Sequence, residues 1–284
     1  MSEPTSNQKE FTLQSSSGEK IRGNVHLPEE TGNAPVLIFC HGFKGFKDWG
    51  MIPHLMDAFA EDGWIAIRFN FSLNGIGEDP LEFTELENFK RNTFTQELAD
   101  VRTVIDAVAS KEIVPAGCDP SRIALLGHSR GGGIALITAA EDERVRSVVT
   151  WASVAEYDRW GDKTKSDWRE RGFIEIMNAR TKQRMPLGVG LLEDAEQNSE
   201  RLDLLRAISA IEVPVLIVHG EQDVSVPVEE GKRLYEASNK ATTELALIPN
   251  ADHTFGAKHP YQGMTKELAI VLKRTRFWLR VHTR

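Results

Sequence analysis

The sequence predicts an α/β fold, in which a mostly parallel central sheet is covered by helices on both faces. Short, largely apolar runs, such as Val36–Cys40 and Trp64–Phe69, are the first indication. A strand has this composition when both of its faces are buried, as in a parallel sheet. Between such runs lie segments with helical spacing, such as Thr93–Ser110, where apolar residues recur every three to four positions. Alternating strands and helices are typical of a parallel sheet.

Taken in order, the elements begin with an antiparallel hairpin. Two alternating runs, Glu10–Leu13 and Lys20–Leu27, flank the turn-rich segment Ser15–Gly18. Residues 1–9 precede this hairpin and are expected to form a flexible tail. Strands and helices then alternate to the end of the chain. The further strands are predicted at 36–40, 64–69, 123–126, 145–151, 213–218 and 243–248, and the helices at 51–61, 93–110, 132–140, 228–238 and 261–281.

Residues 152–210 interrupt this alternation, because they contain no apolar run typical of a buried strand. Helical pieces are expected at 166–179 and 198–209. We therefore predict a helical lid insertion over the edge of the sheet that carries the site, with a core formed by 10–151 and 211–284. Three aromatic residues of this insertion either line a substrate pocket or pack the lid onto the sheet: Trp160, Trp168 and Phe173.

The charge of the insertion supports two interpretations. Residues 156–184 contain eight Lys or Arg and six Asp or Glu, a balance of +2 in an acidic chain. One interpretation is that substrates carry a carboxylate. The other is a solvated surface held by salt bridges.

The bulk composition excludes several classes of protein. The net charge of −8 over 284 residues argues against nucleic-acid binding, which favours a basic face. No run reaches the roughly 18 apolar residues that span a bilayer, and the N-terminus lacks a signal-peptide core, so we expect a cytoplasmic protein without a membrane span. Cys40 and Cys118 each lie beside a predicted strand, where we expect small buried side chains rather than a disulfide or metal site.

The pentapeptide Gly127–Gly131, with the sequence Gly-His-Ser-Arg-Gly, lies between an apolar strand and a helical stretch. This arrangement is typical of a nucleophile elbow. Such a turn holds the serine hydroxyl above the sheet, and its glycines are needed where neighbouring backbone comes too close for a Cβ. The next helix also directs its positive dipole end at the serine. The sequence therefore predicts Ser129 as a nucleophile that attacks a carbonyl carbon.

A serine hydroxyl needs a base, and His253 is the best candidate. It lies in Pro249–Phe255, just after the last predicted strand, where a loop can reach back to the elbow. His259 in the same loop is its competitor. Structural positions are expected for the other histidines.

The acid that orients this base is expected to be Asp223. It lies in the loop after the strand predicted at 213–218, which should be close to the elbow strand. Glu156 and Asp158, which follow the preceding strand, are the alternatives.

Two backbone amides are expected to stabilise the oxyanion that forms on attack. One is the amide of Arg130, the residue after the nucleophile. The other comes from the loop His41–Gly45, with Phe43 as the expected donor, and glycines let this loop approach the substrate. His41 is expected to hold the loop in shape by hydrogen bonding.

Taken together, these motifs resemble the α/β-hydrolase superfamily. Within it the chain is most similar to the cinnamoyl/feruloyl-esterase and dienelactone-hydrolase-like groups, from about residue 10 to the end. The order Ser, Asp, His is the one found in this fold. The resemblance implies a Ser129-Asp223-His253 hydrolase that needs no cofactor and has a lid after the sixth strand. It is carried by residues 41–43, 127–131, 219–223, 226–227 and 251–255.

The leading hypothesis is a carboxylic-ester hydrolase that acts on a small-molecule ester through an acyl-enzyme. The same three residues could cleave an amide, a thioester or a carbon–carbon bond, because one triad serves all of these reactions. A hydrolase fold used as a binding protein with low turnover is the alternative from another class. The acyl and alcohol specificity and the oligomeric state are not specified by any motif.

Overall fold

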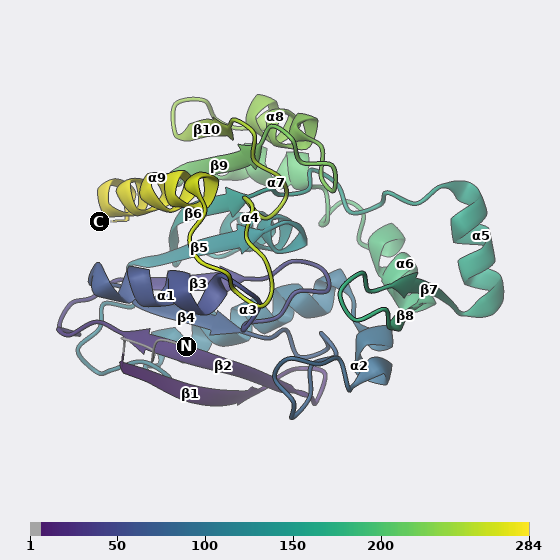
Figure 1. Ribbon diagram of the computed structural model, residues 1–284, viewed down its shortest axis with the longest axis horizontal. Coiled ribbons are helices and arrows are strands. Elements are labelled where there is room, and N and C mark those ends of the chain that lie inside the picture. Colours follow the sequence, from purple (N-terminus) through teal and green to yellow (C-terminus); the bar gives the residue numbers. More distant parts are fainter. Residues whose placement is uncertain (1–6, 284) are drawn as a thin grey trace.

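A central eight-stranded sheet has the strand order β1-β2-β4-β3-β5-β6-β9-β10 in this computed structural model, which describes residues 7–283 (Figure 1). β2 pairs antiparallel with β1 and with β4. The other neighbours in the sheet pair in parallel. The predicted mostly parallel sheet is therefore confirmed.

The strands of this sheet are β1 (Asn7–Gln14), β2 (Lys20–Leu27), β3 (Val36–Cys40), β4 (Ile65–Phe69), β5 (Ile123–His128), β6 (Val145–Trp151), β9 (Val215–Gly220) and β10 (Thr243–Ile248). The helices outside the insertion are α1 (Ile52–Glu61), α2 (Leu86–Arg91), α3 (Phe94–Ala109), α4 (Arg130–Glu141), α8 (Val228–Ala237) and α9 (Lys266–His282). None of the helices within residues 7–283 has the length and apolarity to cross a membrane.

Two hydrophobic cores, one on each face of the sheet, explain the continuous apolar runs. Successive side chains of a strand point to opposite faces. In β3, Val36 and Ile38 therefore pack in the core beneath α3 and α4, whereas Leu37 and Phe39 pack in the core beneath α1 and α9. Every residue of β3, β4 and β9 is buried, as expected for strands covered on both sides.

The start of the first strand differs from the prediction. Residues 7–9 were predicted as tail but belong to β1, because they continue the antiparallel ladder opposite residues 25–27 of β2. The Gln8 side chain also accepts hydrogen bonds from Arg68 and Asn24. These polar residues lack the apolar alternation that marks a strand in sequence. Residues 1–6 of the predicted tail lie outside the described residues.

The insertion of residues 152–210 is not purely helical. It forms α5 (Asp162–Arg171), the hairpin β7 (Phe173–Met177) and β8 (Arg184–Gly188), then α6 (Val189–Gln197) and α7 (Leu204–Ala210). The helix predicted at 166–179 stops at Arg171, because Gly172 takes a left-handed conformation with φ 74°. Beyond it, the more buried Ile174 and Ile176 alternate with exposed residues, which is strand periodicity. In Figure 1, α5, α6, β7 and β8 lie together beyond one end of the sheet.

Candidate active site

Ser129 lies on a tight turn that joins β5 to α4. Its φ of 57° and ψ of −122° place a non-glycine residue in a strained backbone region. The flanking glycines make this turn possible. A Cβ on Gly127 would lie 2.2 Å from the Gly131 carbonyl oxygen, and one on Gly131 would lie 2.3 Å from the Cys40 carbonyl oxygen. The expected exclusion of side chains at both glycines is confirmed.

The structure brings Ser129, His253 and Asp223 together in one hydrogen-bonded relay. Asp223 lies in the loop after β9, and His253 lies in the loop after β10. The Nδ1 atom of His253 is 2.7 Å from Oδ2 of Asp223, and its Nε2 is 3.1 Å from Oγ of Ser129. Because β5, β9 and β10 run parallel, the loops at their carboxyl ends meet at the same edge of the sheet.

Asp223 is held as a carboxylate whose second oxygen is fixed by the backbone. Its Oδ1 accepts hydrogen bonds from the amides of Ser225 and Val226, both at 2.9 Å. Burial favours the neutral acid, but the hydrogen bonds from His253 and the Val226 amide outweigh it and hold the pKa of Asp223 below its ordinary value. The carboxylate is therefore ionised at neutral pH and can orient the imidazole.

The alternative acids and base are engaged elsewhere. Glu156 lies 3.0 Å from Arg233, and Asp158 pairs with Lys165. Nδ1 of His259 accepts a hydrogen bond from the Gly50 amide at 2.9 Å, and its ring packs edge-on against Phe46.

His128 has a contact that the sequence did not indicate. Its Nε2–H donates to the backbone carbonyl of His253 at 2.9 Å. Burial, together with the nearby His253, lowers the pKa of His128 to about 3, so the ring remains a neutral donor. His128 thereby fixes the loop that carries His253. Its place beside Ser129 in the pentapeptide was the only sequence signal for this contact.

The loop after β3 lies against the serine turn. A Cβ on Gly42 would be 3.0 Å from the Cβ of Ser129. Nδ1–H of His41 donates to the Gly42 carbonyl at 2.9 Å, and burial lowers the pKa of His41 to about 4, which keeps the ring neutral. The predicted structural position of His41 agrees with these contacts. The loop also brings Phe43 to the cavity beside Ser129.

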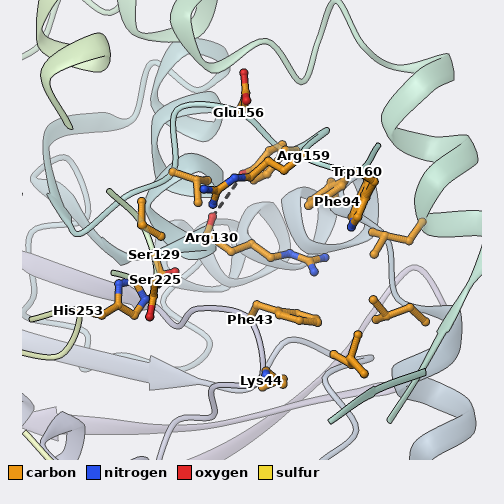
Figure 2. A pocket seen from close by; sticks show the side chains of 16 residues that line it. Phe43, Lys44, Phe94, Ser129, Arg130, Glu156, Arg159, Trp160, Ser225 and His253 are labelled. Atoms are coloured by element: carbon orange, nitrogen blue, oxygen red, sulfur yellow. Dashed lines mark hydrogen bonds between the residues drawn. The ribbon is translucent and has the colours of Figure 1, made fainter. Parts of the chain in front are cut away.

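Arg130 is the first residue of α4, so its amide is among those that a helix leaves without an intrahelical acceptor. No contact of its side chain was predicted from the sequence. The guanidinium pairs with the buried Glu97, with Nη2 at 3.0 Å from Oε1. It also lies 4.3 Å from the ring centroid of Phe94 and 5.3 Å from that of Phe43. In Figure 2 the Arg130 side chain extends between these two rings, so it forms part of the cavity wall.

A cavity of about 460 Å³ opens beside Ser129 and His253 (Figure 2). The insertion supplies many of the lining side chains, including Trp160. The apolar lining residues are Phe43, Phe94, Val154, Tyr157, Trp160, Ile176, Leu187, Leu191 and Val226, and the others are Lys44, Ser129, Arg130, Glu156, Arg159, Ser225 and His253.

Two of the three aromatic candidates for the pocket lie outside the cavity wall. Trp168 is fully buried, and its Nε1–H donates to the Leu187 carbonyl at 2.8 Å. Its ring packs edge-to-face against Trp160 at 5.0 Å. Phe173 is on an outward position of β7, with the ammonium of Lys90 4.9 Å from its ring centroid. Of the two interpretations given for these aromatics, the packing one fits the contacts of Trp168, and neither Trp168 nor Phe173 is part of this cavity wall.

The sheet, the serine turn after β5 and the loops after β9 and β10 define the class of protein, an α/β-hydrolase. A sequence model of the prolyl oligopeptidase family matches residues 71–275, and the chain belongs to this family. It is a serine hydrolase of the α/β-hydrolase type.

Known proteins similar to this chain include esterases. An Escherichia coli protein described as an uncharacterized 31.7 kDa protein in the traX-finO intergenic region is 28% identical over 83% of this chain and 88% of its own length. The probable carboxylic ester hydrolase LipM of Mycobacterium tuberculosis is 24% identical over 79% of this chain and 50% of its own length. The solved esterase domain of a Rhodothermus marinus protein shares the fold, with a TM-score of 0.67, 20% identity and coverage of 98% of this chain and 100% of that domain.

Proposed function

We propose that the protein hydrolyses carboxylic esters through an acyl-enzyme on Ser129. The observation that carries this proposal is the hydrogen-bonded relay of the three residues. Nδ1 of His253 lies 2.7 Å from Oδ2 of Asp223, and Nε2 of His253 lies 3.1 Å from Oγ of Ser129. His253 takes the proton of the Ser129 hydroxyl as the oxygen attacks the ester carbonyl, and then gives this proton to the leaving alcohol. Asp223 holds the imidazole in the required tautomer and stabilises its protonated form.

The amides of Phe43 and Arg130 stabilise the oxyanion in this proposal. Each belongs to a segment next to Ser129, and both residues line the same cavity. Loss of one such donor typically costs about 2.7–4 kcal/mol of transition-state stabilisation. In the second half of the reaction, His253 activates a water molecule that attacks the acyl-enzyme and releases the acid. The hydrogen bond from His128 to the His253 carbonyl keeps the imidazole in place through both steps.

We also propose that residues 152–210 act as a lid over the α/β core and set the substrate pocket. Half of the cavity wall comes from this insertion, including Trp160, Ile176 and Leu191. These side chains line the same cavity as Ser129, so an acyl chain attached to Ser129 would extend along them.

Trp160 and Trp168 give a matched test of this lid. Trp160→Ala is expected to change kcat/KM unequally across a series of acyl chain lengths, because one apolar contact is worth about 1–3 kcal/mol of discrimination. Trp168→Ala is expected to lower the free energy of unfolding by about 3–5 kcal/mol, because its buried ring is lost. Kinetics over the ester series and thermal unfolding measure both effects. A uniform decrease for Trp160→Ala across all chain lengths would show that Trp160 only packs the insertion.

Amide cleavage is the second candidate, because the name of the matching family refers to a peptidase. The test compares short-chain p-nitrophenyl esters with acyl p-nitroanilides of the same acyl group, alongside labelling with a serine-directed phosphonate. We expect rapid ester turnover, an acyl-enzyme burst and one labelled serine. Turnover of the anilides alone would replace the ester proposal with a peptidase. Labelling without turnover of either series would indicate a binding protein.

A further inference from the structure

Four charged side chains line the cavity beside Ser129, three cations and one carboxylate. They are Lys44, Arg130, Arg159 and Glu156. A charge that faces a substrate can select for the opposite charge only if the protein has not already neutralised it. The ion-pair partners of these four residues therefore decide what the cavity attracts.

Three of the four have a partner of opposite charge. The distances are 3.0 Å for Arg130 and Glu97, 3.4 Å for Arg159 and Glu230, and 3.0 Å for Glu156 and Arg233. Each of these three charged groups therefore already faces a protein group of opposite charge.

Lys44 is the exception, because it forms no ion pair with a carboxylate within residues 7–283. Its Nζ donates a long hydrogen bond of 3.4 Å to the Met177 carbonyl and lies 5.6 Å from the ring centroid of Phe43. Burial lowers the pKa of the Lys44 ammonium, and no neighbouring carboxylate opposes this shift. The cavity wall therefore holds one half-buried cation that is not compensated.

The backbone holds Lys44 in a defined position next to the expected oxyanion donor. Lys44 directly follows Phe43 and has a positive φ of 57°, which is uncommon for a residue with a side chain. The turn is closed by a hydrogen bond of 2.9 Å from the Gly45 amide to the Gly42 carbonyl. The ammonium is thus placed on the same short loop as the amide that is proposed to bind the ester oxygen.

The positive balance of the insertion has a different explanation. Several of its basic residues form salt bridges at the surface, as the second interpretation of that charge expected. These pairs are Lys163–Asp167, Lys165–Asp158, Arg169–Glu196, Arg180–Glu82 and Arg184–Glu175. The charge available to a substrate comes instead from Lys44, outside the insertion.

We propose that Lys44 is a specificity residue that binds a carboxylate on the acyl part of the substrate, which would make the preferred substrates half-esters of dicarboxylic acids. This inference rests on the proposed ester hydrolysis and names its substrate class. A carboxylate gives the Lys44 ammonium a charged acceptor in place of a carbonyl oxygen 3.4 Å away. The apolar wall formed by Trp160, Ile176 and Leu191 contacts the methylene groups between the two carbonyl carbons.

The test compares pairs of esters that differ only in the terminal group. Monoethyl glutarate and monoethyl adipate are compared with ethyl pentanoate and ethyl hexanoate, and the released acid is titrated at constant pH. We expect the wild type to prefer the half-esters. Lys44→Gln should reduce the ratio of kcat/KM for half-ester over neutral ester by roughly 10- to 100-fold. Lys44→Arg should retain a preference for the half-esters, because it keeps the positive charge.

Arg184→Gln is the matched control, because it also removes one positive charge but lies on the exposed side of β8. It should leave the preference ratio unchanged. An equal ratio in the wild type and Lys44→Gln would overturn the proposal for Lys44 while ester hydrolysis itself stands. A loss of the preference in Arg184→Gln as large as in Lys44→Gln would assign it to long-range charge and also overturn the proposal. If neither ester class is hydrolysed and no serine is labelled by a phosphonate, the proposed function fails instead.

Discussion

Ser129→Ala is expected to fold normally and to lose about 10⁶-fold in kcat, as serine proteases do when their nucleophile is removed. The reason is that the hydroxyl 3.1 Å from Nε2 of His253 is the only group of the relay that can form the acyl bond. The backbone of the turn does not depend on this hydroxyl, since the Ser129 amide bonds to the Trp151 carbonyl at 2.8 Å. Ester turnover, phosphonate labelling and thermal unfolding together separate loss of chemistry from loss of fold.

Ser225→Ala is a suitable control for this prediction. Ser225 lines the same cavity, and its backbone amide, rather than its hydroxyl, donates to Asp223. The variant should therefore keep phosphonate labelling on Ser129. Labelling at another serine in the Ser129→Ala protein would show that the nucleophile has been assigned to the wrong residue.

The central strands of the sheet could be predicted from sequence because they are buried on both faces. Runs such as Val36–Cys40 are apolar throughout and only 5 residues long, which favours a buried strand over a helix. The serine turn was equally clear, because backbone carbonyls leave no room for a side chain at Gly127 or Gly131. Constraints of this kind restrict which residue types a position can hold, so they can be recognised in the sequence.

The insertion was harder to predict, because its elements are short and half exposed. Its hairpin contains only the weak alternation of Ile174 and Ile176, next to a polar helix. The directions of Trp160 and Trp168 depend on how α5 packs on this hairpin, so sequence could not separate the pocket residue from the packing residue. Likewise, the uncompensated charge of Lys44 is defined only by which other charges pair in three dimensions.

Asp223→Asn is expected to lower kcat by up to about 10⁴-fold with little change in the fold, as for the corresponding change in a serine protease. The amides of Ser225 and Val226 both donate to Oδ1 of Asp223, so the oxygen of the asparagine should remain at that position. Its NH₂ group then faces Nδ1 of His253, at the position of the present Oδ2. Nδ1 must accept this hydrogen bond, which moves the imidazole proton to Nε2 and leaves no base for Ser129.

The change in tautomer gives this prediction a signature beyond lost activity. ¹⁵N chemical shifts of the His253 ring should show the proton on Nδ1 in the wild type and on Nε2 in Asp223→Asn. Glu156→Gln and Asp158→Asn serve as controls, because these carboxylates pair with Arg233 and Lys165 rather than with His253. Both should keep most of the activity. If Asp223→Asn stayed active while one of these variants lost turnover, the orienting acid would instead be the carboxylate after β6.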